Sequence, residues 1–440
     1  MSTQTNVQTN IETKKPSRAT LISASLTGTT IEYFDFFAYA TAAALVFNKV
    51  FFPSQDPIVG TILAFGGIAV GFIARPFGAA LFGHFGDKIG RKSTLVVTLS
   101  IMGFGTFGIG MVPSYDQIGV WAPILLMLLR VLQGLALGGE WGGAVLITYE
   151  HAKQGEKGAL TSFPSAGMPL GLSLSTVCFV AMAATMPSSA FEAWGWRVPF
   201  IIGVALVIVG LFIRTRIPES EEMIELKKDD AQPKVPIGTL FRTRTMSLVL
   251  CALAFVPCGF YFYAAYTFGM SYGKDSVGYS YDTLLMATLV FAVIYFVSIL
   301  GAGAVSDKLG RKNTMYVGYG MTLLTPIPFF AMLGSGNGIL LVLGFVLAGV
   351  ANGVMYGPYA ALLCESFEPR VRYTGISLGL TLGGVLGSAF SSMLFAQLFK
   401  STGSWMPIAL LVMGSAVVSA VAVAKLKHNP APQTLDRPTR

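Results

Sequence analysis

The chain has 440 residues, of which 53% are hydrophobic and only 12% are charged. This composition leaves too little polar surface to cover a soluble globular protein, so it predicts a membrane protein. The formal net charge of +8 does not indicate a nucleic-acid partner, because the basic residues lie between apolar runs, where they favour contact with the lipid bilayer.

The first half of the chain is predicted to be a polar tail followed by six membrane spans. Residues 1–19 lack the apolar core and cleavage site of a signal peptide and are expected to form a cytoplasmic tail. About 20 apolar residues cross a bilayer as a helix, and residues 20–215 contain six such runs, which predicts an N-terminal six-helix bundle. The runs lie at about 20–47, 58–82, 93–112, 118–148, 158–185 and 196–214.

A charged segment at 216–244 separates this bundle from a second one and is predicted to be a cytoplasmic linker. Residues 245–425 are expected to form a C-terminal six-helix bundle, and residues 426–440 a second cytoplasmic tail. The apolar runs of this half lie at about 246–271, 282–304, 313–333, 338–363, 374–399 and 404–424. The predicted fold is therefore an all-α polytopic membrane protein with about twelve transmembrane helices in two halves.

The distribution of basic residues predicts the orientation of the chain. If both termini face the cytoplasm, 24 of the 30 Lys and Arg residues lie on cytoplasmic segments, as the positive-inside rule requires. Four basic residues then lie outside, and Arg75 and Arg130 lie within the membrane. We therefore expect a multi-pass protein of a bacterial-type cytoplasmic (inner) membrane, with both termini inside.

One charged segment occurs twice. Residues 83–92 and 303–312 share the pattern G-x-x-x-D-x-x-G-R-K at an offset of half the chain, and paired halves of this kind are typical of secondary transporters. A simple turn on the cytoplasmic side explains the glycines and basic residues. It does not explain Asp87 and Asp307, which work against the positive bias. We expect both aspartates to accept hydrogen bonds from arginines and backbone N–H groups of neighbouring helices, forming a latch that breaks when the halves rock apart.

This repeated segment resembles the signature loop of the major facilitator superfamily, and other motifs extend the resemblance over essentially the whole chain. The R-x-x-Q-G motif at 130–134, with segments 32–36 and 75–78, is similar to motifs of the metabolite:proton symporters. Segments 214–220 and 365–375 are similar to loop motifs shared with sugar porters. The expected cytoplasmic gate comprises Asp87, Arg91, Asp307, Arg311, Glu150, Glu365 and Arg372.

Glu32, Asp35, Arg130 and Glu140 stand out within the first and fourth spans, because each unpaired charge in a membrane costs about 2.5–3.5 kcal/mol or more. The predicted proton-coupling residues are Asp35, Glu32 and Arg130. Glu32 and Asp35 share a helix face, from which a carboxylate can meet Arg130 across the bundle. We expect an Asp35–Arg130 pair to couple proton movement, because protonating the aspartate discharges the pair and frees the arginine. The alternative is a static ion pair that fixes helix packing. Glu140 is either on the proton path or a structural partner of Arg75 or of a loop arginine.

The spans of the second half carry fewer charges and more aromatic and amide groups, so this half is expected to shape the pocket. Asn352 and Tyr356 lie one helical turn apart, and Asn352 is at the depth of Gln133 in the first half. Arg130 is also suited to holding a substrate carboxylate through two parallel hydrogen bonds. The predicted substrate site comprises Arg130, Gln133, Tyr33, Tyr263, Asn352 and Tyr356.

The resemblance implies a proton-coupled symporter. Local sequence near residues 82–87, 121–124 and 194–200 is most similar to the shikimate-type members, which implies import of a small organic acid together with protons. The protein is expected to be a monomer. Proton-coupled uptake of a zwitterionic osmolyte such as proline or betaine is the alternative, although the short predicted C-terminal tail lacks the coiled coil of the osmosensing members. A more remote alternative is a membrane-embedded enzyme or a sensor. The sequence contains no nucleotide-binding motif, catalytic constellation or metal-ligand pattern that would support it, and no cofactor is expected.

Overall fold

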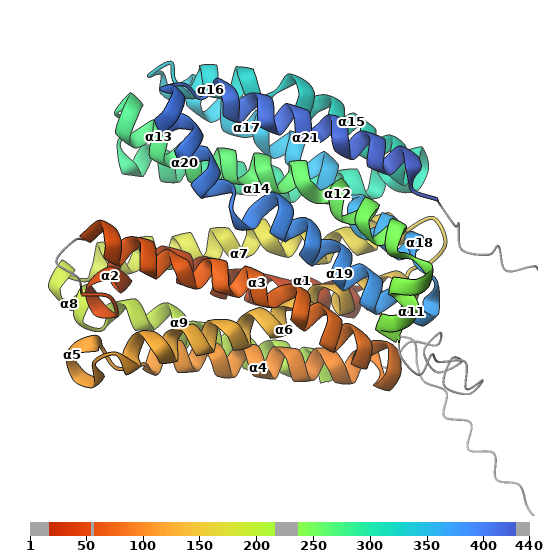
Figure 1. Ribbon diagram of the computed structural model, residues 1–440, viewed down its shortest axis with the longest axis horizontal. Helices are drawn as coiled ribbons and strands as arrows, with labels where there is room; N and C mark the ends of the chain where they lie inside the picture. The colour runs from red at the N-terminus through yellow and green to blue at the C-terminus, as the bar shows by residue number, and fades with distance from the viewer. Residues whose placement is uncertain (1–16, 54–56, 216–235, 428–440) are drawn as a thin grey trace, which may run out of the picture.

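The computed structural model describes residues 17–53, 57–215 and 236–427, and over these residues the secondary structure is helical, without strands. The helices form two bundles, the N-terminal one drawn from red to yellow and the C-terminal one from green to blue (Figure 1). Most of the predicted tails and residues 216–235 of the predicted linker lie outside the described residues.

Six long helices build the N-terminal bundle. The first, α1 (Arg18–Ala42), continues through η1 (Ala43–Phe47) into α2 (Asn48–Val50). The others are α3 (Pro57–Ile89), α4 (Arg91–Met111), α6 (Trp121–His151), α7 (Lys157–Thr185) and α9 (Val198–Thr215). Three short elements connect them, namely α5 (Tyr115–Ile118), α8 (Ser188–Ala193) and η2 (Gly195–Arg197).

The C-terminal bundle repeats this plan with more interrupted helices. Its long helices are α12 (Thr245–Tyr263), α14 (Tyr281–Leu309), α15 (Arg311–Leu324), α17 (Gly338–Tyr356), α19 (Arg372–Gly384) and α21 (Met406–Lys425). Shorter elements extend or join them, namely η3 (Ala264–Phe268), α13 (Gly269–Tyr272), η4 (Gly273–Val277), α16 (Pro326–Leu333), α18 (Tyr359–Ser366), η5 (Pro369–Val371), η6 (Val385–Ala389) and α20 (Ser391–Thr402). The described end of the predicted linker is itself helical and forms α11 (Pro236–Thr243).

In the described part of the chain, ten helices are long and apolar enough to cross a bilayer. The pair α15 and α16, bent by 44°, gives an eleventh if the two are counted as one broken span. Helix α1 is less apolar because it carries Glu32 and Asp35, but it is 25 residues long and packs against α7. Counting α1 gives twelve, and the predicted all-α fold in two halves is confirmed.

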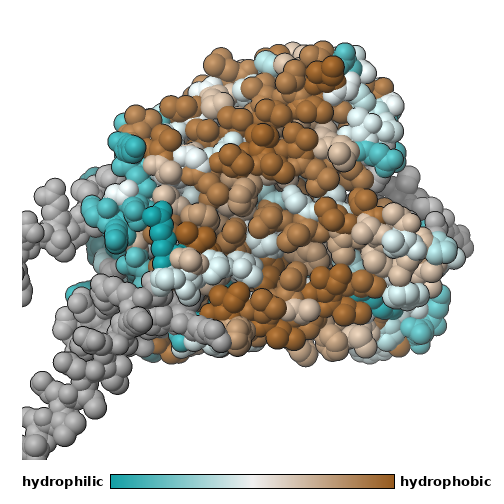
Figure 2. Space-filling model, turned by 180° about the vertical axis from the view of Figure 1, so that it is seen from behind, coloured by the Kyte–Doolittle hydropathy of each residue, from teal (hydrophilic) through white to brown (hydrophobic). Residues whose placement is uncertain are grey.

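The outer surface is apolar in its middle and polar at its ends. Figure 2 shows apolar side chains gathered in a broad band, with hydrophilic residues toward the two edges. Large apolar side chains on the outer surface include Phe77, Phe104 and Leu324, which are 68%, 64% and 76% exposed. An apolar surface of this extent is stable when lipid surrounds it, because soluble proteins rarely expose large contiguous apolar patches.

The repeated charged segment is not the loop that the sequence predicted. Helix α3 continues to Ile89 and α14 to Leu309, and only Gly90 and Gly310 separate them from α4 and α15. Both glycines have positive φ angles, 133° and 91°, which other residues rarely adopt. The prediction ended each helix where the apolar run ended, but a helix continues past the bilayer surface as long as its backbone hydrogen bonds are made.

Candidate functional site

Asp87, near the end of α3, joins the two bundles at the end that carries α11 and α18 in Figure 1. Its carboxylate accepts hydrogen bonds from the backbone N–H groups of Tyr373 (3.1 Å) and Thr374 (3.0 Å) and from the Thr374 hydroxyl (2.7 Å). These residues begin α19, and the N-cap residue of that helix, Val371, makes no capping bond with its side chain. Because a helix N-terminus has unpaired N–H groups and partial positive charge, Asp87 serves as the cap that α19 lacks.

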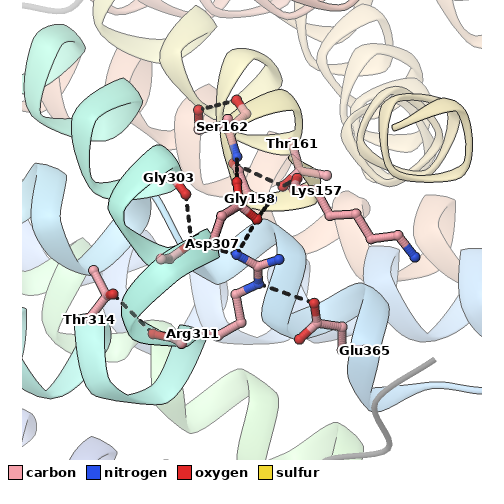
Figure 3. Close-up of polar contacts among 12 residues, drawn as sticks. Lys157, Gly158, Thr161, Ser162, Gly303, Asp307, Arg311, Thr314 and Glu365 are labelled. Carbon is pink, nitrogen blue, oxygen red and sulfur yellow. Dashed lines mark hydrogen bonds and ion pairs between the residues drawn. The ribbon is translucent and has the colours of Figure 1, made fainter. Parts of the chain in front are cut away.

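Asp307, near the end of α14, makes the equivalent contact in the opposite direction (Figure 3). It accepts hydrogen bonds from the N–H groups of Gly158 (2.8 Å) and Ala159 (2.9 Å) in the first turn of α7. The N-cap residue of α7, Glu156, likewise makes no capping bond with its side chain. Each half of the protein therefore supplies an aspartate that caps a helix of the other half.

Arginine and glutamate side chains surround both caps. Arg311 donates to Asp307 at 2.7 Å and to Glu365 at 3.1 Å. Around the other cap, Glu150 forms an ion pair with Arg91 at 2.9 Å and lies 4.0 Å from Arg372 of α19. The seven predicted gate residues thus gather in two clusters at one end of the protein, which we call the latch end. Their role as a gate remains a prediction.

Asp35 and Arg130 do not form the direct ion pair that the sequence predicted, because Gln133 lies between them. The Gln133 amide nitrogen donates to Asp35 Oδ2 at 2.5 Å, and its oxygen accepts from Arg130 Nη1 at 2.9 Å. The same nitrogen also donates to the Thr106 hydroxyl at 3.1 Å. Asp35 is buried and its Oδ1 atom has no hydrogen-bond partner. The carboxylate and the guanidinium are therefore linked through a neutral amide.

The remaining contacts of Arg130 hold it within the N-terminal half. Its Nε donates to the Gly67 carbonyl at 3.2 Å, and the guanidinium carbon lies 3.9 Å from the centre of the Tyr39 ring. The hydrogen bonds and ring contact described for Arg130 and Gln133 all go to residues of this half. Two of the six predicted substrate residues thus make these contacts within one half, and the single substrate site stays a prediction.

The other four predicted substrate residues lie where the bundles face each other. The Tyr33 hydroxyl of α1 is near that of Tyr356 in α17, and Tyr263 of α12 interacts with Tyr33. Asn352 lies one turn before Tyr356, and both side chains are buried. Neither amide atom of Asn352 has a hydrogen-bond partner. Because an unpaired buried polar atom is costly, this position is suited to hydrogen bonding with a bound solute.

Arg75 and Trp141, which were not among the predicted substrate residues, also lie at this interface. Trp141 of α6 stacks on Tyr356 with ring centres 6.4 Å apart, and its indole N–H has no partner. The guanidinium of Arg75 lies over the rings of Phe36 (5.0 Å) and Phe72 (4.2 Å). The sequence could have identified Arg75 as a site residue, because the predicted orientation of the chain places this arginine inside the membrane, where a charge is costly.

The structure also separates Glu32 from Asp35. Glu140 forms an ion pair with Arg214 of α9 at 2.8 Å, so its partner is the arginine at the end of the sixth span and not Arg75. Glu32 is buried, its Oε2 atom has no hydrogen-bond partner, and it interacts electrostatically with Glu140, Arg75 and Arg214. The two carboxylates predicted to share one role therefore belong to different clusters.

Two helical bundles with mutual caps and a polar interface between them define a class of protein, the duplicated helical membrane transporters. The family model of the Major Facilitator Superfamily matches residues 26–392. The chain belongs to this superfamily, as the sequence motifs indicated. It is therefore a membrane-spanning transporter and not an enzyme.

Named relatives cover most of the chain. The inner membrane metabolite transport protein YhjE of Escherichia coli (strain K12) is 40% identical over 82% of this chain and 83% of its own. The shikimate transporter of that organism is 33% identical (92% and 93%), and its proline/betaine transporter is 30% identical (95% and 84%). Among solved structures, the proton:xylose symporter XylE bound to 6-bromo-6-deoxy-D-glucose has a TM-score of 0.77 over 92% of this chain and 94% of its own, at 17% identity. That likeness concerns the fold.

Proposed function

We propose that this protein is a proton-coupled symporter that takes up a small organic acid by alternating access. The observation that carries the proposal is the buried chain of Asp35, Gln133 and Arg130. A carboxylate and a guanidinium are expensive inside a membrane, and they are expected there when they move protons or bind a solute. The names of the relatives, which include a shikimate transporter, support a small organic acid as the solute.

The coupling step follows from the hydrogen bonds of Gln133. While Asp35 is charged, its Oδ2 atom holds the Gln133 amide, which orients the glutamine oxygen toward Arg130. Protonation removes the charge of the carboxylate and weakens the bond to the amide, since hydrogen bonds to charged groups are about twice as strong as neutral ones. Gln133 and Arg130 are then free to adopt a second arrangement, so the proton favours one access state over the other.

The two aspartate caps supply the moving part of the proposed cycle. We place the latch end and both termini on the cytoplasmic side, as the distribution of basic residues favours. Intact caps hold the cytoplasmic ends of the halves together, and release of the solute inward requires both to break. This cycle needs one chain, and we propose a monomer in a bacterial-type inner membrane; YhjE, a relative, is named as an inner membrane protein.

Uptake into proteoliposomes under an imposed pH gradient tests the proposal. We expect accumulation of at least one radiolabelled acid from a panel of shikimate, benzoate and 2-oxoglutarate, and loss of that accumulation when a protonophore collapses the gradient. Asp35→Asn should abolish accumulation but leave exchange of labelled for unlabelled acid. If the protein accumulates proline or betaine and none of the acids, the osmolyte alternative replaces the proposal.

A further inference from the structure

We infer that the substrate carboxylate binds Arg75 at the interface between the halves, and that Glu32 must carry a proton for it to bind. The inference rests on the proposed function and adds to it a substrate class, a single carboxylate without a cationic group. It moves the anion-binding role from Arg130 to Arg75. It also assigns Glu32 a proton that enters with the substrate.

Arg75 is the cation of the interface that has no counter-ion. In the described part of the chain, no carboxylate lies within ion-pair distance of it, and its Nε atom has no hydrogen-bond partner. Aromatic rings of Phe36 and Phe72 lie under its guanidinium. Its charge acts on Tyr33 and Tyr263, from opposite halves, so it lies where both bundles contribute side chains. A guanidinium with free donors matches the geometry of a carboxylate.

Arg130 is a weaker candidate for this role. Two of its nitrogens are already engaged, by the Gly67 carbonyl and the Gln133 oxygen, and the Tyr39 ring covers the guanidinium. Its side chain is 1% exposed. A substrate carboxylate would have to displace these contacts, whereas at Arg75 it fills an unused position.

The charges around Glu32 explain why a proton is required. The charged groups that act on it are Glu140 from α6, Arg75 from α3 and Arg214 from α9, with the hydroxyls of Tyr33 and Tyr356 nearby. Arg214 is already paired with Glu140 at 2.8 Å, which leaves Arg75 as the cation available to Glu32. A substrate anion at Arg75 would add a second negative charge beside that one cation. Because like charges repel strongly in a low-dielectric site, binding favours the neutral form of Glu32.

The unused hydrogen-bonding groups at the interface also favour an acid. The Arg75 Nε, the Trp141 indole N–H and the Asn352 amide nitrogen are donors without acceptors. Carboxylate and hydroxyl oxygens of a small acid satisfy such donors, and the Trp141 and Tyr356 rings offer an apolar face to its carbon skeleton.

A zwitterion could bind the same two residues, Arg75 and Glu32, but it would require Glu32 to be charged. Its carboxylate would bind Arg75 while its cationic group would pair with charged Glu32, so no proton on Glu32 would be needed. Neutralising Glu32 should therefore strengthen or preserve the binding of an acid and weaken the binding of a zwitterion. The sign of this effect distinguishes the two classes.

Equilibrium binding to the purified full-length protein in detergent provides the test, with proline and with shikimate or benzoate, whichever of the two monocarboxylates the wild type accumulates better. For the wild type, the affinity for the acid should fall by up to tenfold per pH unit as Glu32 ionises, although the acid itself stays fully charged between pH 6 and 8. Glu32→Gln should bind the acid with high affinity at every pH. Arg75→Gln should lose at least tenfold in affinity, and Arg75→Lys should recover part of that loss.

Two partly exposed residues of the opposite end provide matched controls. Arg197→Gln and Glu192→Gln make the same chemical changes away from the interface, and both should bind the acid as the wild type does. Unfolding temperatures of all variants, measured without ligand, identify any that are misfolded.

Four outcomes would overturn the inference. Wild-type affinity in folded Arg75→Gln, or an unchanged pH dependence in Glu32→Gln, contradicts it while accumulation by the wild type leaves the proposed function intact. Weaker binding of the acid to Glu32→Gln at every pH also contradicts it. Absence of any uptake or binding of the acids by the wild type overturns the proposed function and the inference together.

Discussion

Asp87 and Asp307 occupy equivalent positions in the two halves, and each caps the first turn of a helix that belongs to the opposite half. Neither capped helix has a capping side chain of its own. The missing N-caps explain why the aspartates recur in a segment otherwise rich in basic residues. The two bundles are joined by contacts that are lost when they separate, which is what a reversible latch requires.

Asp87→Asn should weaken the latch and raise the population open at the latch end. The change removes the charge from three hydrogen bonds, which we expect to cost about 1–3 kcal/mol and to shift the population roughly five- to 150-fold. Labelling of an introduced Ser162→Cys by an impermeant maleimide from the cytoplasmic side measures the opening, because Ser162 is buried between α7 and α14. Asp116→Asn, on the short helix α5, is the control. Equal labelling rates in both variants would argue against the latch.

Gly158→Ala should disrupt the second cap. A Cβ atom at this position would lie 2.3 Å from Arg311 Nη1 and 2.5 Å from the Gly303 carbonyl oxygen, so α7 and α14 would have to move apart. We expect uptake to fall at least tenfold and the labelling of Ser162→Cys to rise. Gly320→Ala is the matched control, since a Cβ there meets no atom within 4 Å and should leave uptake unchanged. Similar uptake by the two alanine variants would mean that close contact at Gly158 is unnecessary.

Gln133→Leu should uncouple transport although Asp35 and Arg130 are unchanged. Leucine neither donates to the carboxylate nor accepts from the guanidinium, so protonation of Asp35 would no longer be transmitted to Arg130. Gradient-driven accumulation should be lost while exchange of labelled for unlabelled acid continues. Thr106→Val removes a different hydrogen bond of Gln133 and should reduce accumulation less. Accumulation at the wild-type level in Gln133→Leu would show that coupling does not pass through the amide.

Arg130→Lys should lose accumulation despite keeping the positive charge. Arginine donates from separate nitrogens to Gly67 and Gln133 and also lies over the Tyr39 ring, and the single ammonium of lysine cannot reproduce this geometry. We expect at least a tenfold loss of accumulation in proteoliposomes, with affinity for the acid little changed because its carboxylate binds Arg75. A large loss of affinity with normal coupling would return the substrate-binding role to Arg130.

The sequence predicted the class of fold because that class depends on local properties. Apolar runs long enough to span a bilayer, a charged segment between two sets of six, and a motif repeated after half the chain are all visible without a structure. Where the boundaries depended on more than hydropathy, the prediction was less accurate. Helices α3 and α14 continue beyond their apolar runs to Ile89 and Leu309. Helix α1 carries Glu32 and Asp35, which are buried inside the protein.

The sequence by itself determined that the protein is a membrane transporter built as two related halves, and it identified which charged residues required an explanation. Only the tertiary structure decided how those residues are grouped. Helical periodicity placed Glu32 and Asp35 on one face, but the neighbouring helices bring Gln133 to Asp35, and Arg75 and Glu140 into the surroundings of Glu32. Partners that lie on other helices are set by packing between helices, which the spacing of residues within one helix does not specify.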